Sequence, residues 1–598
     1  MTEHGDRNLP IEEMRDRYRI EREKRMRPEG LGQYAELAGD FEDLDVDTFV
    51  EPGFTRDPIV EETQVVIVGG GFAGMLTAID LTKLGMRDFR LVEKAGDFGG
   101  TWYWNRYPGC MCDVESYTYL PLLEETGYMP TEKYASAPEI FGYCQLLGRT
   151  FDLYPHALFQ TVITGAEWDA GTERWIVTTS RGDRLASKFV VVAGGILHKP
   201  KLPGIPGIRG FGGRMFHTSH WDYSYTGGSP TEPMDELADK RVGIVGTGAT
   251  AVQAIPQLAR AAKELYVFQR TPSAVGERNN GPTDEAWFRS QPPGWQAERI
   301  ENFTNAVTGR QPERNLVGDG WTEVMWVNTQ QAPEDPEVAA ALERSDFETM
   351  QKLRGRVDAI VEDPETAAKL KPWYGKNCKR VCFHDDYLPA FNRPNVHLVD
   401  TDGRGVDAVT PTGAVVDGVE YPLDCLIFAS GFEVNTDYAG RVGFDPVGRD
   451  GVALSERWSQ GARTLHGVLA DGFPNFCIIS FLPAGFGANF VPFLSKSAEH
   501  VADLIVRCER EGIATIEASP EGEDDWLMVL YGTAAGVAAY STTCTPSYYN
   551  SEHGPIDAKR ARNLVYAESL LDYAGHLERW RATDDLPGTK ITRVGTSA

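Results

Sequence analysis

The chain has 598 residues and the composition of a globular protein, with 41% hydrophobic and 24% charged residues. This length gives room for several domains and excludes a small metal- or disulfide-stapled module. Acidic residues outnumber lysine and arginine by 87 to 59, a net charge of −28 that repels phosphate backbones and anionic lipid. We therefore expect neither nucleic acid nor membrane as a partner. The most apolar stretch, 476–494, is interrupted by proline and glycine and indicates a buried strand and loop rather than a membrane span.

The nine cysteines are scattered along the chain from Cys110 to Cys544, and no secretory hydrophobic segment precedes them. We expect them to be free thiols, and the protein to be cytoplasmic. The pairs Cys110/Cys112 and Cys378/Cys382 lack the CxxC spacing of zinc sites, so no metal site is predicted.

Residues 1–63 form a polar N-terminal extension. The stretch 11–27 has the mixed charge of a solvated helix, and 40–47 is rich in acids. We interpret the extension as a surface helix and wrap rather than a binding arm.

A strand, a tight turn and a helix begin at Gln64, in the sequence QVVIVGGGFAG. Gly69 allows the turn, Gly71 lets the backbone approach a pyrophosphate, and Gly74 permits close packing of helix on strand. The next strand, FRLVE, ends at Glu93, where a carboxylate accepts hydrogen bonds from ribose hydroxyls. An ordinary surface acid is the alternative at this position.

The sequence RVGIVGTGATA repeats the arrangement, with Gly246, Gly248 and Ala251 at the corresponding positions. Its second strand, ELYVF, leads to Arg270 and Thr271 instead of an acid. Arginine pairs with a 2′-phosphate that a carboxylate would repel, although a salt bridge to a neighbouring residue is the alternative. The two sites together predict a flavoprotein in which NADPH reduces FAD.

The predicted fold class is α/β, with two Rossmann-like dinucleotide-binding domains for FAD and NADP, a helical insertion and an N-terminal extension. Short apolar strands at 189–193 and 424–429 are typical of sheets covered on both faces. The predicted boundaries are 1–63 for the extension, 64–195 and 425–598 for the FAD domain with the C-terminal segment, 196–274 and 378–424 for the NADP domain, and 275–377 for the insertion.

The segment GGTWYWNRYPGCMCD follows the first nucleotide unit and ends at Asp113. Disulfide reductases need a redox cysteine pair in this region, with four residues between the thiols, and this chain has none there. The segment instead carries aromatic residues that could wall a flavin ring. We expect Gly100, Thr101, Trp102 and Asp113 to contact the cofactor.

Between the two units, FGGRMFHTSHWD matches the pattern FxGxxxHxxxW(P/D), with His217 and Trp221 at fixed positions. Here the chain resembles the type I Baeyer–Villiger monooxygenases, whose fingerprint this is. The later segment CTPSYYN, with Glu552 and Gly554, resembles members that accept large ketones. Length and composition are also similar to those of oxygenases that make sesquiterpenoid lactones of the pentalenolactone type.

The resemblance implies a mechanism and a set of roles. Reduced FAD and O2 give a C4a-peroxyflavin that attacks a ketone carbonyl, and the tetrahedral adduct rearranges to an ester or lactone. The resemblance assigns stabilisation of the peroxide to Arg380, orientation of that arginine to Asp113, and a cofactor-phosphate contact to Lys379. His217 and Trp221 are expected to couple domain motion to NADP binding. The implied partners are O2 and a bulky, cyclic ketone, with the chain a monomer or small homo-oligomer.

Three alternatives stay open at this point. A surface Lys–Arg dipeptide would explain Lys379 and Arg380 without catalysis. A flavin monooxygenase that oxygenates sulfur or nitrogen would share the fold, although Trp221 and the Arg380/Asp113 pairing disfavour it. A nucleotide-binding sensor that lost turnover would also share the fold. The segment 482–489 departs from the commoner GPxSP form, which affects the expected flavin contacts.

Overall fold

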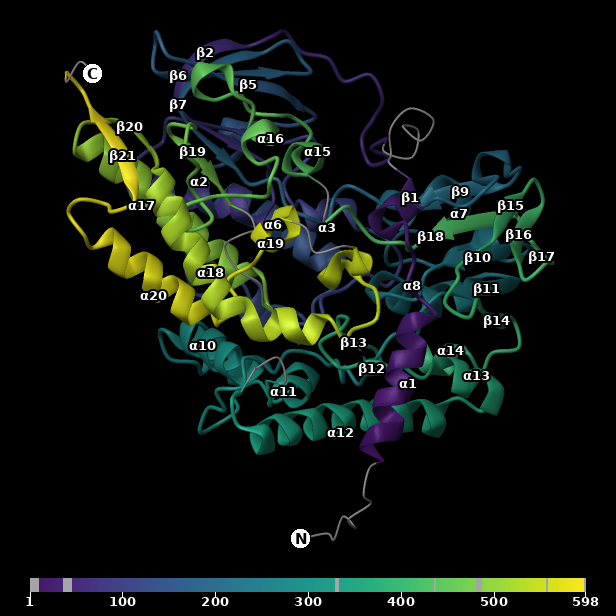
Figure 1. Cartoon of the computed structure of the whole chain (residues 1–598). Coiled ribbons are helices and arrows are strands. Elements are labelled where there is room, and N and C mark those ends of the chain that lie inside the picture. The colour runs from purple at the N-terminus through teal and green to yellow at the C-terminus, as the bar shows by residue number, and fades with distance from the viewer. Residues whose placement is uncertain are drawn as a thin grey trace.

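The computed structural model describes residues 10–35, 46–328, 333–434, 437–479, 487–554 and 558–595. Two sheets built largely of parallel strands lie in separate parts of the molecule, with helices α10 to α12 forming a third region (Figure 1). The predicted α/β class is confirmed. Most of the segment predicted to approach the flavin, 482–486, lies outside the described residues, as does the larger part of the acidic run 40–47.

The first sheet has seven strands in the order β4-β3-β2-β7-β6-β5, with β19 beside β7. The strands are β2 (Val60–Val68), β3 (Phe89–Val92), β4 (Ala157–Leu158), β5 (Ile163–Asp169), β6 (Arg174–Thr179), β7 (Arg184–Val192) and β19 (Phe476–Ile478). Strand β2 pairs in parallel with β3 and β7, and its residues Val65 to Ile67 are fully buried on both faces. Helix α2 (Phe72–Lys83) covers one face, and α17 (Val491–Arg510) packs on α2.

The second sheet has five parallel strands in the order β14-β11-β10-β18-β9. They are β9 (Arg214–His217), β10 (Arg241–Val245), β11 (Glu264–Gln269), β14 (Val396–Asp400) and β18 (Cys425–Phe428), with helix α8 (Ala249–Ala261) after β10. The predicted domain boundary after residue 424 is wrong, because β18 pairs with β10 and belongs to this sheet. Its apolar sequence suits either sheet, so composition alone could not assign it.

The segment between the two parts of the second sheet is helical. It contains α9 (Glu285–Arg289), α10 (Trp295–Val307), α11 (Gly320–Met325), α12 (Pro336–Ile360) and α13 (Pro364–Leu370). Strand β12 (Val275–Gly276) precedes this insertion and pairs in parallel with β13 (Cys382–Phe383), which follows it. A small antiparallel sheet of β15 (Ala408–Thr410), β16 (Gly413–Val416) and β17 (Val419–Pro422) follows β14 and the short helix α14 (Tyr387–Ala390).

The N-terminal segment begins with α1 (Ile11–Glu23), which crosses α12 (Figure 1). The rings of Tyr18 and Phe347 are 5.2 Å apart at this contact. The 3₁₀ turn η1 (Gly30–Gln33) and strand β1 (Tyr34–Ala35) follow, and β1 pairs with β8 (Leu202–Pro203). The interpretation of this extension as only a surface wrap is wrong for Gln33 and Tyr34, because both line the central cavity described below.

The C-terminal elements lie against the first sheet and reach back towards the insertion (Figure 1). They are α18 (Pro520–Ser541), η8 (Tyr548–His553), α19 (Ala558–Arg562), α20 (Leu570–Arg581) and the antiparallel pair β20 (Ile513–Ala518) and β21 (Thr589–Arg593). Shorter helices complete the chain: α3 (Thr101–Trp104), α4 (Ser116–Tyr119), α5 (Leu123–Thr126), α6 (Ala137–Thr150), α7 (Tyr223–Thr226), α15 (Tyr438–Val442) and α16 (Leu454–Arg457). Among the helices described, none combines the length and the apolar character needed to cross a bilayer.

Cys378 and Cys544 form a disulfide, and the other seven cysteines are free and buried. The expectation of nine free thiols is therefore wrong for these two. The half-cystines are 166 positions apart, so no local spacing in the sequence could reveal the pair.

Candidate active site

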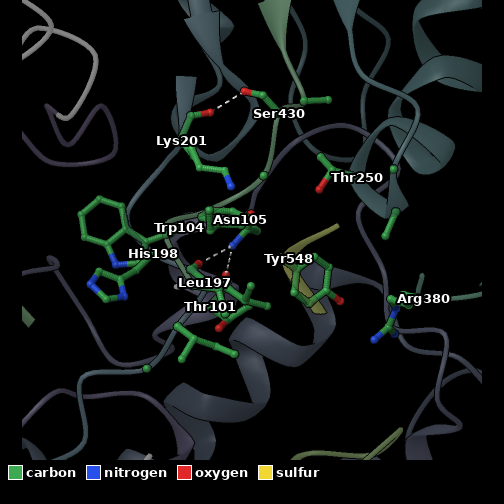
Figure 2. Close-up of a pocket in the computed structure, with 18 of the residues that line it drawn as sticks. Thr101, Trp104, Asn105, Leu197, His198, Lys201, Thr250, Arg380, Ser430 and Tyr548 are labelled. Carbon is green, nitrogen blue, oxygen red and sulfur yellow. Dashed lines mark hydrogen bonds between the residues drawn. The ribbon is translucent and has the colours of Figure 1, made fainter. Parts of the chain in front are cut away.

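A continuous cavity of about 970 Å³ runs between the two sheets. Both glycine turns line it, through Gly69 and Gly71 on one side and Gly246 and Gly248 on the other. Figure 2 shows Thr101 and Asn105 of the aromatic segment on one wall, with Arg380 and Tyr548 across from them. The fold thus brings most of the predicted site residues to one continuous space.

The first turn is tight enough to need glycine at two positions. Gly69 has a φ of 107°, and a Cβ there would lie 2.6 Å from the carbonyl oxygen of Ala193. A Cβ on Gly74 would lie 1.9 Å from the carbonyl oxygen of Gly69, so Gly74 permits the close contact of α2 with the turn. This close contact is the physical basis of the packing role that the sequence predicts for Gly74.

Glu93 lies at the end of β3, against the same turn. It is 5% exposed, and its carboxylate accepts hydrogen bonds from the backbone N–H groups of Gly70 at 2.5 Å and Ala95 at 2.7 Å. Burial raises its pKa. The side chain also lines the cavity, so it is no ordinary surface acid.

The aromatic segment folds over this turn. Gly100 has a φ of 53°, and a Cβ on it would lie 2.7 Å from the Cα of Gly71. Trp102 is buried and donates its indole N–H to the hydroxyl of Tyr119 at 3.0 Å. Asn105 holds α3 in place by donating to the carbonyl oxygen of Thr101 at 2.9 Å (Figure 2).

The second turn repeats the first at the start of α8. Gly246 has a φ of 114°, and a Cβ there would lie 2.5 Å from the carbonyl oxygen of Ala429. A Cβ on Gly248 would meet no atom within 4 Å, so there is open space in front of this turn, and Ala251 is fully buried behind it. Both turns line the cavity in front of a helix N-terminus, an arrangement that fits two dinucleotide pyrophosphates.

Positively charged side chains gather at the end of the cavity beyond the second turn. Arg270 donates to the side-chain oxygen of Gln33 at 2.7 Å and pairs with Glu552 at 3.2 Å. Lys379 donates to the carbonyl oxygen of Pro546 at 2.8 Å, and burial together with the charge of Arg270 lowers its pKa to about 7.

Two further residues complete this end of the cavity. The Nζ atom of Lys201 lies 3.6 Å from the centre of the Tyr34 ring, and burial lowers the pKa of Lys201 to about 8. Thr271 lines the cavity and accepts a hydrogen bond from the Nε of Arg25 at 3.1 Å. We call Arg270, Lys379 and Lys201 the cation cluster.

Arg380 and Asp113 meet at the wall of the same cavity. The guanidinium of Arg380 donates to a carboxylate oxygen of Asp113, and its Cζ lies 5.1 Å from the centre of the Trp321 ring. Asp113 is 7% exposed, whereas the Arg380 side chain is 34% exposed. Burial acts to lower the pKa of Arg380, but Asp113 raises it well above its ordinary value. Arg380 is thus a fixed cation that still has N–H groups facing the cavity, and it is not a surface residue.

His217 and Trp221 are buried but are absent from the cavity lining among the described residues. The Nδ1 of His217 lies 2.9 Å from the hydroxyl of Ser219, and burial lowers its pKa to about 3. Trp221 donates its indole N–H to Thr226 at 3.1 Å. A neutral, packed histidine here cannot act on a ligand in the cavity directly.

Several residues that line the cavity were not predicted from the sequence to belong to the site: Gln33, Tyr34, Lys201, Tyr548 and Glu552. Gln33 and Tyr34 belong to the extension, which was interpreted as a surface wrap. Tyr548 and Glu552 were named only as part of the C-terminal segment that resembles family members accepting large ketones. Two basic residues, Lys199 and Lys201, lie in the loop that follows the buried strand β7, and this signal was not used in the prediction.

Comparisons with known proteins agree with this geometry. Residues 66–284 match the family described as pyridine nucleotide-disulphide oxidoreductase. The chain is 48% identical to a neopentalenolactone D synthase of Streptomyces avermitilis, over 98% of this chain and 99% of that protein. It is 46% identical to Baeyer-Villiger monooxygenase 4 of Dietzia sp., over 96% and 95% of the two chains. A solved polycyclic ketone monooxygenase from Thermothelomyces thermophila is 39% identical, with a TM-score of 0.92 over 98% of this chain and 100% of that chain.

Proposed function

The chain belongs to the Baeyer–Villiger monooxygenases, and from this premise we propose that it acts on a bulky polycyclic ketone through Arg380 and Asp113. It is an FAD-dependent enzyme that consumes NADPH and O2 and converts a ketone to an ester or lactone. The observation that carries the proposal for the site is the Arg380/Asp113 pair, which faces a cavity shared by both glycine turns.

The two turns fit the two cofactors. FAD lies at the turn of Gly69, where Glu93 accepts hydrogen bonds from an unphosphorylated ribose, and NADPH lies at the turn of Gly246. The open space before Gly248 supports the second assignment. When bound, reduced FAD supplies the activated oxygen that enters the ketone.

Arg380 stabilises negative charge on the reacting oxygen atoms. An anion in a cavity of low polarity is costly unless a fixed donor faces it, and a guanidinium that stays charged at every working pH meets this need. Its exposed N–H groups bind the oxygen that develops negative charge as the carbonyl is attacked. Because the group is already in place, it needs no reorganisation during the reaction.

Asp113 positions Arg380. The buried carboxylate accepts from one nitrogen of the guanidinium and leaves the others for the reacting atoms. The Trp321 ring packs on the guanidinium and restricts its rotation. A heteroatom oxygenase needs no fixed cation for an anionic nucleophile, so this pair favours attack on a carbonyl carbon.

The cation cluster binds the 2′-phosphate of NADPH. Arg270 and Lys379 supply charge-assisted donors, and the hydroxyl of Thr271 supplies a further donor. This charge discriminates NADPH from NADH, because NADH has a neutral hydroxyl at the same position.

His217 and Trp221 couple the two nucleotide-binding parts. The segment that follows β9 contacts the aromatic segment of the FAD part, where the rings of His220 and Trp104 are 5.4 Å apart. Tyr223 donates its hydroxyl to the carbonyl oxygen of Arg106 at 2.5 Å. Movement of β9 would therefore be transmitted to the wall of the flavin site.

The polycyclic character of the substrate is supported by two relatives. One is named for the synthesis of neopentalenolactone D, and the structural neighbour is named for polycyclic ketones. The test is to incubate the purified protein with NADPH and ¹⁸O2 and a panel of a polycyclic ketone, cyclohexanone and a thioether. We expect a lactone of the polycyclic ketone that contains one labelled oxygen atom. Sulfoxide as the only product would replace the proposal with heteroatom oxygenation.

We also propose a cytoplasmic location and a monomer or small homo-oligomer. Seven of the nine cysteines are buried free thiols, which supports a reducing compartment, whereas the Cys378–Cys544 disulfide is of a kind that is rare there. Cell fractionation and light scattering of the purified chain test the two statements, and recovery of the protein outside the cytoplasm or in large assemblies would contradict them.

A further inference from the structure

Glu552 occupies the centre of the cation cluster. Its carboxylate accepts from the Tyr34 hydroxyl at 3.0 Å and pairs with Arg270 at 3.2 Å, and its side chain is only 4% exposed. Burial acts to raise its pKa, but Arg270, Lys379 and Lys201 together lower that pKa below the ordinary value. Glu552 is therefore a buried carboxylate anion among three cationic side chains.

Glu552 and Gln33 both accept hydrogen bonds from Arg270, the side chain that we expect to face the 2′-phosphate. One terminal nitrogen of Arg270 donates to Gln33 and the other to Glu552. Arginine binds phosphate most strongly through two parallel N–H groups. Each terminal nitrogen keeps a second N–H group, but a phosphate held there would lie beside the Glu552 carboxylate. Repulsion between the two anions favours displacement of Glu552 from Arg270.

The backbone around Glu552 is strained. Ser551, Glu552 and His553 are consecutive non-glycine residues with φ of 51°, 54° and 58°. A left-handed backbone conformation is unfavourable for residues other than glycine, and it persists only where surrounding contacts stabilise it. The contact with Arg270 is one of those that hold this segment, together with Tyr34 and the hydrogen bond from the backbone N–H of Glu552 to the carbonyl oxygen of Ser547 at 2.8 Å. Loss of the Arg270 contact would therefore weaken the hold on a strained backbone.

The other end of the same turn is anchored beside Arg380. The Cys378–Cys544 disulfide fixes the chain before η8, and Ser547 donates its hydroxyl to the carbonyl oxygen of Cys378 at 3.0 Å. Tyr548 follows directly and lines the cavity near Arg380 (Figure 2). Release of Glu552 would therefore act on a short turn that is fixed at one end and carries a residue of the reaction site.

We propose that Glu552 is a built-in counterion of the 2′-phosphate subsite, which the phosphate of NADPH displaces and which the hydroxyl of NADH cannot displace. This inference rests on the proposed function, since it assumes that Arg270 faces the 2′-phosphate. Glu552 is then a residue that determines cofactor specificity, and its displacement links NADPH binding to the turn that carries Tyr548.

The test compares two ligands that differ only in the 2′-phosphate, namely adenosine 2′,5′-bisphosphate and adenosine 5′-monophosphate. Their binding to the FAD-loaded enzyme is measured by calorimetry. In Glu552→Gln, which removes the competing charge, we expect the bisphosphate to bind about tenfold more tightly and the monophosphate to bind as before. Glu517→Gln is the matched control, because Glu517 is also buried and pairs with Arg449 at 2.9 Å away from the cavity.

Hydrogen exchange of the unmodified enzyme gives a second measurement that does not depend on a variant that folds. We expect faster exchange at residues 551–554 with the bisphosphate than with the monophosphate. Weaker bisphosphate binding by Glu552→Gln, or slower exchange of this segment, would overturn the inference.

Arg270→Gln tests the 2′-phosphate subsite separately from the role of Glu552. Loss of the preference for the bisphosphate in this variant supports the 2′-phosphate subsite whatever Glu552 does. If the unmodified enzyme shows no such preference, the assignment of the subsite fails, and the inference about Glu552 fails with it.

Discussion

Asp113 and Arg380 are 267 positions apart in the sequence, yet the guanidinium of Arg380 donates directly to the carboxylate of Asp113 at the wall of the cavity. Asp113 ends the aromatic segment of the FAD part, and Arg380 follows the helical insertion in the NADP part. The pair therefore forms only when both nucleotide-binding parts and the insertion are in their folded arrangement.

Arg380→Ala should abolish lactone formation while leaving reduction of FAD by NADPH intact. Removal of one donor to a developing oxyanion lowers turnover by about 10²–10³-fold. Product analysis, NADPH oxidation and hydrogen peroxide release measure the two processes separately, and we expect NADPH to be consumed with peroxide as the product. Arg299→Ala is the control, because Arg299 pairs with the buried Glu115 at 2.5 Å but does not line the cavity. Normal lactone yield from Arg380→Ala would contradict the role.

Asp113→Asn should lower turnover less than Arg380→Ala, since the amide oxygen can still accept from the guanidinium but no longer carries charge. We expect a fall in kcat with KM for the ketone nearly unchanged. Steady-state kinetics on the ketone identified by the panel check this, and a loss of ketone binding with unchanged kcat would assign Asp113 to substrate binding instead.

Arg270→Gln should raise KM for NADPH and leave KM for NADH unchanged. A hydrogen bond to a charged group contributes about 1.5–3 kcal/mol, which corresponds to roughly a 10–100-fold change in the ratio of kcat/KM for the two cofactors. An equal loss with both cofactors would mean that Arg270 maintains the structure through Gln33 and Glu552 rather than recognising the phosphate.

The local features of the site could be predicted from the sequence because each depends on a short run of residues. A strand followed by glycines at fixed positions gives the turns at Gly69 and Gly246, and the residue that ends the next strand gives Glu93 or Arg270. The same turn geometry is found in the structure, with left-handed φ at both first glycines.

The features that could not be predicted are pairings between distant segments. The contact of Tyr34 with Glu552 spans 518 positions, and the disulfide spans 166. Strand β18 joined the second sheet although its apolar sequence suits either sheet. Such pairings depend on the order of strands and the path of the connecting segments, which one sequence does not specify.

Loss of the disulfide should weaken the binding of NADPH more than the binding of FAD. Cys378 directly precedes Lys379, and the bond holds this segment to the turn before Tyr548. In the double variant Cys378→Ser/Cys544→Ser we expect a lower midpoint of thermal unfolding and a severalfold higher KM for NADPH, with the FAD content unchanged. Dithiothreitol should reproduce the effect in the unmodified enzyme and have no effect on the variant. Equal KM values in all four conditions would contradict this linkage.

Binding of the 2′-phosphate should take up protons above neutral pH, because the pKa of Lys379 is lowered to about 7 in the cofactor-free chain by burial and by Arg270. A phosphate favours the protonated amine and raises that pKa, so affinity for adenosine 2′,5′-bisphosphate should fall as the pH rises from 7 to 9. Calorimetry at pH 8 in buffers of different ionisation enthalpy measures the uptake directly. Lys379→Arg keeps the charge and should reduce the uptake, leaving the part that belongs to Lys201, whose pKa is lowered to about 8. Uptake that is the same in Lys379→Arg, or affinity that rises with pH, would show that Lys379 does not face the phosphate.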